Sequence, residues 1–386
     1  MNTALHFGAE KIGRGFLAQF YCEAGLHIIF VDVRDDLITL LNERDSYRIR
    51  FMNEARDEVR IQNFSALHAR EADAVSKAFA SASFVSTAVG ERALPAVARS
   101  LAPGIALRRA NGGGAVDILV CENMAGAAEF LKAETHKHLG ADDAEWLSAH
   151  VGFVDAIIGR MVPETSQEAL AEDPLMITPE PYPNIYLDAA AFKAAPLDHP
   201  HVFAVDDYGA YDARKLFMHN MGHVATAYLG YPRGHRFVYE AIEDKAIRTV
   251  VAGAMRETAL ALHRKFGLDL EECEEHGDEL IQRFANPHLG DTITRVAGDP
   301  MRKLGRQDRL IGAARLCEEQ KVPAESVAVA CAAALAYDHP DDPMAVQLQE
   351  AIATQGVEAV LHEVCGLAPG DALGKRILDA YHQRER

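Results

Sequence analysis

The amino-acid sequence predicts an α/β protein of two domains. A Rossmann-type domain with a mostly parallel sheet is expected at residues 1–195, and a mostly α-helical domain at 196–386. Three observations predict this arrangement. Strand-like and helix-like segments alternate in the first third of the chain, a Pro-rich irregular stretch occupies about 174–200, and helical periodicity dominates the rest. The length of 386 residues is also too great for one ordinary domain and suits two.

The first βαβ unit begins with a short apolar strand at 4–7, which ends at Gly8. A helical pattern at 12–24 follows and stops at Gly25, a residue common just past helix ends. A second buried strand is expected at 27–31. Such units imply a parallel sheet covered by helices. Further elements of this domain are expected at 84–89 (strand), 94–101 (helix) and 118–121 (strand).

Residues 47–51 and 59–64 alternate in polarity and are predicted to form an antiparallel excursion from the main sheet. The domain junction is placed in the Pro-rich stretch. Four helices are expected after it, at 212–229, 239–266, 268–283 and 322–337. Two such domains would leave a cleft between them, a common place for a small-molecule site.

The composition limits the possible partners. The sequence has 39 Lys and Arg against 57 Asp and Glu, a formal net charge of −18, which argues against a nucleic-acid partner. No apolar run approaches the ~20 residues that span a bilayer. The six cysteines are scattered, without a C-x-x-C pair. We therefore expect a reduced, cytoplasmic protein with no membrane partner, either a monomer or a small homo-oligomer.

A glycine-rich segment, GAEKIGRG at 8–15, follows the first expected strand and opens a helix. Its glycines permit a tight turn and leave the helix N-terminus open to a pyrophosphate. Asp32 ends the second strand, where a carboxylate can bond both ribose hydroxyls of NAD and repel the extra phosphate of NADP. The residues expected to bind NAD are Gly8, Ala9, Ile12, Gly13, Asp32, Thr87, Ala88 and Val89.

Glu10 departs from this fingerprint, because it stands where the middle glycine of G-x-G-x-x-G belongs. NAD binding then requires the Glu10 carboxylate to point away from the phosphates, and pairing with Lys11 or Arg14 is expected. The alternative is a nucleotide-like fold that no longer binds NAD.

The segment KLFMHNMGH at 215–223 could carry catalysis. At about 100° per residue, Asn220 would lie about 140° and His223 about 80° from Lys215 around a helix. A lysine with a lowered pKa can accept the proton of an alcohol, and an amide can donate to the oxygen as negative charge develops. Spacing alone favours an ordinary mixed helix with an exposed lysine and packed histidines. His219 and His223 lack a third ligand, so no metal site is expected.

Asn123 follows the strand expected at 118–121, and strand carboxyl ends face the ligand crevice in such sheets. Asn123 could join Asn220 in a two-amide oxyanion site. The alternative is that Asn123 caps the helix that follows.

A basic cluster lies at 295–309. If this stretch is helical, Arg302, Arg306 and Arg309 share one face. In so acidic a chain the cluster suits a phosphate, which takes bidentate contacts from arginine. The alternative is a solvated helix face partly paired with Asp299 and Asp308.

Together these segments resemble the polyol-specific long-chain dehydrogenases, whose Lys-x4-Asn-x2-His spacing is met by Lys215, Asn220 and His223. The resemblance runs from near residue 3 to at least residue 312. Two segments, PMRKL at 300–304 and DRL at 308–310, point to the branch of the family whose substrates carry a phosphate. The matching motifs are FGA and IGRGF within 7–16, CENM at 121–124, HVGFVD at 150–155, FANP at 284–287, PMRKL at 300–304 and DRL at 308–310.

This resemblance implies metal-independent, NAD-dependent oxidation of D-mannitol 1-phosphate to D-fructose 6-phosphate, and the reverse reduction. It implies that Lys215 is the general base, that Asn123 and Asn220 polarise the carbonyl oxygen, and that His223 holds the substrate. The substrate residues that it implies are Arg295 and Lys303 for the chain, with Arg302, Arg306 and Arg309 as candidates for the phosphate.

A second departure concerns Gly159, which stands where the family reads the aspartate of Val-Asp-Arg. The missing carboxylate is expected to loosen the substrate site or to change what it accepts. Two other functions stay open. One is a related polyol or hexuronate dehydrogenase, similar to mannitol 2-dehydrogenase or to fructuronate and tagaturonate reductases. The other is a non-catalytic nucleotide or sugar-phosphate sensor, suggested by Glu10.

Overall fold

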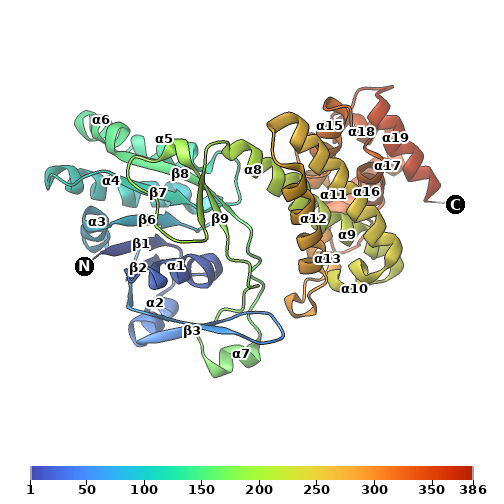
Figure 1. Cartoon of the computed structure of the whole chain (residues 1–386). Coiled ribbons are helices and arrows are strands. Elements are labelled where there is room, and N and C mark those ends of the chain that lie inside the picture. Colours follow the sequence, from blue (N-terminus) through green and yellow to red (C-terminus); the bar gives the residue numbers. More distant parts are fainter. Residues whose placement is uncertain (1, 385–386) are drawn as a thin grey trace. The chain divides into compact units, whose positions relative to one another are not determined.

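The computed structural model describes residues 2–384 and divides into two compact units, Met1–Tyr208 and Gly209–Arg386 (Figure 1). The first unit is built on a mostly parallel sheet and the second contains helices, so the α/β prediction is confirmed. Among the described residues, no helix is long and apolar enough to cross a membrane.

The sheet of the first unit has the strand order β10-β9-β8-β7-β6-β1-β2-β5. Neighbours pair in parallel from β8 through to β5, whereas β9 runs antiparallel to β8 and carries β10 parallel to itself. The chain builds outward from β1 in one direction and then in the other, which makes the carboxyl ends of β1 and β6 a switch point where ligands bind in such sheets. The strands are β1 (Thr3–Phe7), β2 (His27–Asp32), β5 (Phe64–His68), β6 (Phe84–Thr87), β7 (Val116–Val120), β8 (Val151–Ile158), β9 (Ile185–Asp188) and β10 (Val202–Val205).

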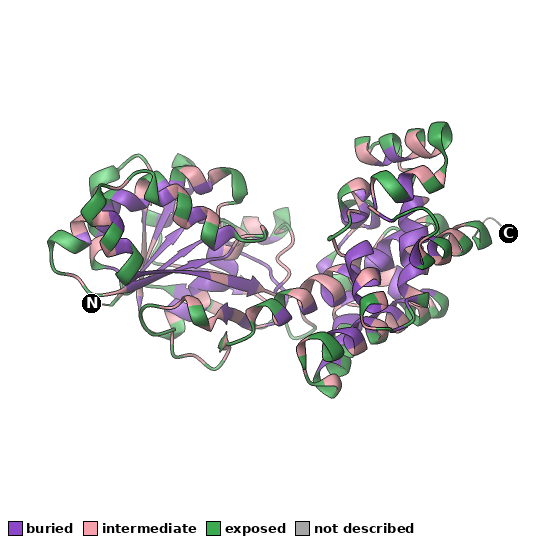
Figure 2. Ribbon diagram, turned by 90° about the horizontal axis from the view of Figure 1, so that it is seen from above, coloured by how far each residue is buried: buried purple, intermediate pink, exposed green. Residues whose placement is uncertain are grey.

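Helices cover both faces of this sheet, and their buried sides face the strands (Figure 2). On one face, apolar residues of the glycine-rich segment, α1 and α2, such as Phe16, Phe20 and Leu41, pack on the strands. On the other face, Phe79 and Leu101 belong to the second core cluster. The helices of this unit are α1 (Ala18–Glu23), α2 (Asp35–Asn42), α3 (Ala72–Ser81), α4 (Leu94–Ala110), α5 (Ala127–His136), α6 (Ala141–His150) and α7 (Gln167–Glu172).

The predicted antiparallel excursion is confirmed as β3 (Ser46–Arg50) paired with β4 (Glu58–Gln62). Alternation places Tyr47 in the core. The Tyr47 hydroxyl donates to the carbonyl of Arg14 at 2.8 Å, which fastens the hairpin to the glycine-rich segment.

The second unit contains helices packed around α9, α11 and α16 (Figure 1). The small apolar residues of α16 are almost all buried, which lets neighbouring helices approach it closely. The helices are α8 (Tyr208–Arg214), α9 (Met221–Gly230), α10 (Val238–Glu243), α11 (Lys245–Phe266), α12 (Leu270–Phe284), α13 (Ile293–Ala297), α14 (Pro300–Lys303), α15 (Ile311–Glu319), α16 (Glu325–Leu335), α17 (Pro343–Gln355), α18 (Val357–Glu363) and α19 (Ala372–Gln383).

The single helix expected at 239–266 is wrong, because Asp244 divides it into α10 and α11. Asp244 has an extended backbone with ψ 120°, and its carboxylate accepts the N–H groups of Ala246 and Ile247. A short acidic side chain competes with helix continuation and caps the helix that follows.

Candidate functional site

The glycine-rich loop is held in close contact with the loop after β6. Gly8 has φ +99°, and a Cβ atom there would lie 2.3 Å from the carbonyl oxygen of Ala88. A Cβ atom on Gly13 would lie 2.4 Å from Nε2 of His6, a buried histidine whose pKa burial lowers to about 4. Only glycine fits at either position, so the loop takes the shape that a pyrophosphate needs at a helix N-terminus.

Asp32 ends β2 and is joined to the glycine-rich loop by its carboxylate. Its Oδ2 accepts the N–H of Ala9 at 2.7 Å, and its Oδ1 accepts those of Val33 and Arg34 at 2.8 and 3.1 Å. Ala9 is fully buried, and its N–H holds the carboxylate of Asp32 in place. Val33, directly beside this carboxylate, is 71% exposed, an apolar side chain suited to an adenine ring.

The Glu10 side chain pairs with neither Lys11 nor Arg14, and that expectation is wrong. Its carboxylate lies 3.0 Å from the guanidinium of Arg34. Lys11 pairs with Glu164, and Arg14 is buried and donates to the carbonyls of Ala9 and Leu175. The reason is that Arg14 faces the core, whereas Glu10 and Arg34 both lie at the surface where β1 and β2 end.

Glu122, which sequence reasoning did not single out, fixes the loop after β6. Its carboxylate accepts the N–H groups of Val89 and Gly90, both at 2.8 Å, and the hydroxyl of Thr87 at 3.1 Å. Desolvation raises the pKa of Glu122, although these hydrogen bonds oppose the change. The predicted cofactor residues Thr87, Ala88 and Val89 are therefore held in one conformation. The available signal was the position of Glu122, two residues after β7 and directly before Asn123.

Residues 215–220 form a π-helical turn between α8 and α9. The N–H of Met221 donates to the carbonyl of Leu216, five residues earlier. In such a turn, residue i+5 lies one turn above residue i. Asn220 is therefore closer to the face of Lys215 than the α-helical spacing predicted, and that angular prediction is wrong. A second π-helical turn, at 13–17, lies in the glycine-rich segment, and such turns are frequent at functional sites.

Lys215 is electrostatically suited to lose a proton. Desolvation lowers its pKa, the carboxylate of Asp212 opposes the change, and the guanidinium of Arg309 lowers the pKa further. A lysine of this kind has a larger neutral fraction near neutral pH than an exposed one. Its amine form can accept a proton from an alcohol.

His223 is held by Asp291, a residue that sequence reasoning missed. The Nε2 of His223 lies 3.1 Å from Oδ2 of Asp291, and the other oxygen of Asp291 pairs with Arg295. The His223 ring also stacks on Phe284, with 5.0 Å between ring centroids. Desolvation raises the pKa of Asp291, but the hydrogen bond from His223 and the charge of Arg295 hold it below its ordinary value.

His219 lies in the core of the second unit rather than in a ligand set. It is 6% exposed, its ring packs beside Phe284, and burial holds its pKa well below the ordinary value. Within residues 2–384, no group of three or more His, Cys, Asp or Glu side chains is placed to hold a metal ion.

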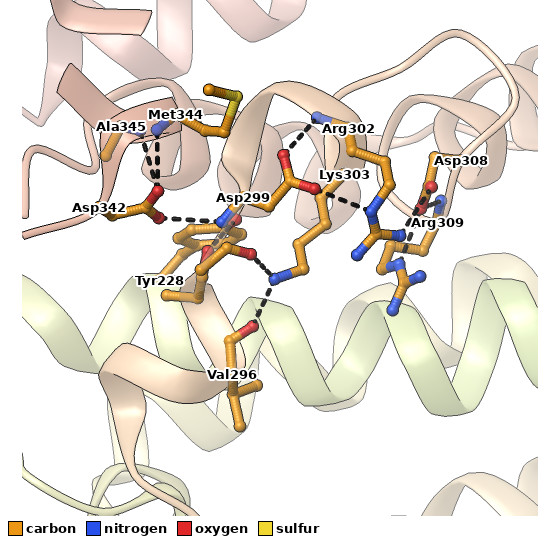
Figure 3. A network of polar contacts seen from close by, with 12 residues as sticks. Tyr228, Val296, Asp299, Arg302, Lys303, Asp308, Arg309, Asp342, Met344 and Ala345 are labelled. Atoms are coloured by element: carbon orange, nitrogen blue, oxygen red, sulfur yellow. Dashed lines mark hydrogen bonds and ion pairs between the residues drawn. The ribbon is translucent and has the colours of Figure 1, made fainter. Parts of the chain in front are cut away.

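The basic cluster does not form one helix face, and that prediction is wrong. The helix α14 ends at Lys303, and the chain turns before α15 begins at Ile311. The turn is stabilised by hydrogen bonds from the N–H of Gly305 to the carbonyl of Arg302 and from the N–H of Asp308 to the carbonyl of Gly305. Asp299, with φ +60°, starts this segment and is held by a bond from its N–H to Asp342 at 2.9 Å (Figure 3).

The cations of the cluster have different partners. Arg302 pairs with Asp299 at 3.0 Å and with Asp308 at 3.4 Å, and Arg309 pairs with Asp308 at 2.7 Å (Figure 3). These are the carboxylates named in the alternative interpretation, which the structure confirms as ion-pair partners. Arg306 instead donates to the carbonyl of Gly366 at 2.6 Å.

Lys303 is buried, at 5% exposure, and its ammonium donates to the carbonyls of Val296 and Gly298 (Figure 3). Desolvation, with the nearby charges of Arg309 and Arg302, lowers its pKa to about 8. These two carbonyls occupy two of its three N–H groups.

Asn123 and Gly159, also singled out from the sequence, lie in the first unit. Asn123 is exposed in the turn after β7. The helix-cap alternative is wrong, because α5 begins at Ala127 with Gly126 as its N-cap residue. At Gly159, a Cβ atom would lie 2.7 Å from Cε1 of Tyr182, so the ring of Tyr182 occupies the space of the missing side chain.

The two units match two adjacent protein-family models. The model described as the mannitol dehydrogenase Rossmann domain matches residues 2–200, and the mannitol dehydrogenase C-terminal domain matches residues 207–384. Among curated proteins, mannitol-1-phosphate 5-dehydrogenase of Bacillus subtilis is 39% identical over 382 residues, which cover 98% of this chain and all of that protein. The enzyme of the same name from Bacillus pumilus is 38% identical over 379 residues, which cover 97% of this chain and 98% of that protein.

Two solved structures are also similar. Mannitol 2-dehydrogenase of Pseudomonas fluorescens, in a ternary complex with NAD and D-mannitol, has a TM-score of 0.73 at 20% identity and covers 99% of this chain and 90% of its own. Substrate-free D-sorbitol dehydrogenase has a TM-score of 0.75 at 20% identity, with 86% of this chain and 79% of its own covered. At such identities the likeness shows the fold alone.

Proposed function

The chain belongs to the mannitol dehydrogenase family, and from that premise we propose that it interconverts D-mannitol 1-phosphate and D-fructose 6-phosphate with NAD. The observation that carries the proposal is the polar set of the second unit. It combines a lysine of lowered pKa, a histidine fixed by a carboxylate, and Arg309, whose charge acts on both Lys215 and Lys303.

Lys215 serves as the general base. In the oxidation, its neutral amine accepts the proton of the hydroxyl on carbon five, and in the reduction its ammonium returns that proton to the carbonyl oxygen. NAD, when bound, accepts the hydride from the same carbon. Asn220, on the turn above Lys215, and Asn123 donate to the oxygen as negative charge develops on it. No step in this scheme needs a metal ion.

His223 and Asp291 position the substrate. An ionised Asp291 accepts a hydrogen bond from His223 only if Nε2 carries the proton, which leaves Nδ1 of the neutral ring as an acceptor. We assign a substrate hydroxyl to that atom. Arg295, held by the other oxygen of Asp291, is exposed enough to reach the substrate chain as well.

The phosphate is assigned to the cations around α14. The Arg302–Asp299 pair is exposed and the Arg302–Asp308 pair is long, at 3.4 Å, so both are weak and a phosphate can replace them. Arg309 and Lys303 interact electrostatically with each other, which gathers positive charge at one place. The proposed substrate residues are Arg295, Arg302, Lys303, Arg306 and Arg309.

The first unit fits NAD. Gly8 and Gly13 leave no side chain where a pyrophosphate must approach the helix, and Asp32 offers a carboxylate at the end of β2. The exposed Val33 gives an apolar surface beside Asp32. The residues proposed to hold the dinucleotide are Gly8, Ala9, Ile12, Gly13, Asp32, Thr87, Ala88 and Val89.

One observation favours a second candidate, a related polyol or hexuronate dehydrogenase. The arginines of the cluster already have acidic or carbonyl partners, as ordinary surface arginines do. In that case the basic cluster only forms ion pairs within the protein, and the substrate needs no phosphate group.

The test is a specificity comparison with purified protein and NADH. Fructose 6-phosphate, free fructose, fructuronate and tagaturonate are supplied in turn, and kcat/KM is measured for each. The proposal expects the phosphate ester to be preferred by about a hundredfold or more, the contribution of a bidentate, charge-assisted anion contact. Equal or better turnover of fructose or of a hexuronate would favour the second candidate.

A further inference from the structure

An ion pair joins the two segments that flank the proposed ribose site. Glu10 lies in the loop after β1, and Arg34 lies two residues after Asp32 at the end of β2. The Oε1 of Glu10 is 3.0 Å from a terminal nitrogen of Arg34. The backbone N–H of Arg34 also donates to Asp32, which fixes the start of its side chain beside the carboxylate proposed to bind the ribose.

Arg34 is the type of residue that receives the extra phosphate of NADP. In dinucleotide-binding sheets, an arginine near the end of the second strand accommodates the 2′-phosphate through its planar fork of N–H donors. Here that fork is occupied. One terminal nitrogen donates to Glu10, and the other, with Nε, donates to Asp36 at 2.8 and 3.3 Å. The two carboxylates also raise the pKa of Arg34.

We propose that Glu10 is a specificity-determining residue, which together with Asp36 neutralises Arg34 and so makes the chain select NAD over NADP. The carboxylate of Glu10 withdraws a donor from the 2′-phosphate and adds a negative charge beside it. This inference rests on the proposed NAD-dependent function and deepens it. It also gives a role to the residue that departs from the glycine fingerprint.

Glu10 forms its ion pair with Arg34, whereas the two cations nearest to Glu10 in the sequence have other partners. Lys11, the next residue, pairs with Glu164, and Arg14 is buried against two carbonyls. Glu10 and Arg34 are both exposed, so a phosphate can reach the arginine without moving the core. Removing the charge of Glu10 therefore changes the site and not the fold.

The experiment measures binding of adenosine 2′,5′-bisphosphate and of adenosine 5′-monophosphate to the full chain by titration calorimetry. The two probes differ by the 2′-phosphate, and neither needs the sugar site. Glu10→Gln keeps the side-chain size and removes the charge. We expect it to raise the preference for the bisphosphate by about tenfold, as loss of one charge near a phosphate predicts at moderate salt. The kcat/KM ratio of NADPH to NADH should rise with it.

Two further variants separate this role from a general change of surface charge. Arg34→Gln combined with Glu10→Gln should abolish the gain, because the arginine that would receive the phosphate is gone. Glu43→Gln, which removes an exposed carboxylate beyond the end of α2, should leave the preference at the wild-type value.

An unchanged preference in Glu10→Gln, with the monophosphate still bound, would overturn the proposal, and so would a gain that persists without Arg34. Failure of the wild-type chain to bind either nucleotide would contradict nucleotide binding by the first unit, and this inference with it. Failure to reduce fructose 6-phosphate would instead contradict the proposed reaction and leave these binding measurements intact.

Discussion

The Nε2 of His223 lies 3.1 Å from a carboxylate oxygen of Asp291, and the other oxygen of Asp291 pairs with Arg295. One buried carboxylate thus fixes two groups assigned to the substrate, from α9 and α13. Asp291→Asn keeps the shape and removes the charge that holds both. We expect kcat/KM to fall on the order of 100-fold, the effect of displacing substrate-positioning groups by about 1 Å.

The matched control is Asp278→Asn, an exposed aspartate on α12. It should keep full activity. Binding of adenosine 5′-monophosphate, which reports the first unit, should be unaltered in both variants. Full activity of Asp291→Asn, or equal losses in the two variants, would contradict the positioning role.

The pH dependence of mannitol 1-phosphate oxidation should report the lowered pKa of Lys215. Oxidation requires the neutral amine, so kcat should rise with pH through this pKa, which lies below the ordinary value of a lysine, and then level off. Carbonyl reduction requires the ammonium and should fall over the same range. A rate for oxidation that decreases as pH rises through this region would be inconsistent with a lysine base.

Two charge variants should move that profile in opposite directions. Arg309→Gln removes a cation that disfavours the ammonium, so the pKa should rise and the profile should shift to higher pH. Asp212→Asn removes an anion that favours the ammonium, so the profile should shift to lower pH. Shifts of about one unit are expected for charges at this range. Arg315→Gln, on α15, is the control, and shifts of the same sign in both test variants would refute the assignment.

The contact between Gly159 and Tyr182 should make residue 159 intolerant of a side chain. Gly159→Ala would place Cβ 2.7 Å from the ring of Tyr182, a buried residue, and should lower the free energy of unfolding by about 1–3 kcal/mol. Trp146, the one tryptophan of the sequence, lies in the first unit and reports its unfolding by fluorescence. Gly114→Ala, where a Cβ atom meets open space, is the control. An equal free energy of unfolding for the two variants would show that the ring of Tyr182 moves aside at little cost.

Features encoded by neighbouring residues could be predicted from the sequence. The β1–loop–helix–β2 order and the positions of Gly8 and Asp32 follow from local periodicity and turn chemistry. The strands β5, β8, β9 and β10 were not identified, because strands that are short or continuously apolar carry little periodic signal.

Most of the site geometry depends on contacts between residues that are distant in the chain. Asp291 lies far from His223 in sequence, and Glu10 meets Arg34 only because β1 and β2 end side by side. The π-helical turn at 215–220 is invisible to a search at the α-helical period, so the face shared by Lys215 and Asn220 was misjudged. The basic cluster failed as a helix because Asp299 and the turn after Lys303 interrupt it.

Reduction of fructose 6-phosphate with Lys215 as the proton donor is tested by NADH oxidation, followed in the absorbance band of NADH, for the wild-type chain and for Lys215→Ala. Lys245→Ala, an exposed lysine at the start of α11, is the control. We expect rapid oxidation by the wild type and the control, and a loss of about 100- to 10,000-fold in kcat for Lys215→Ala. Undiminished oxidation by Lys215→Ala would contradict the lysine base, and no oxidation by the wild type would contradict the proposed reaction.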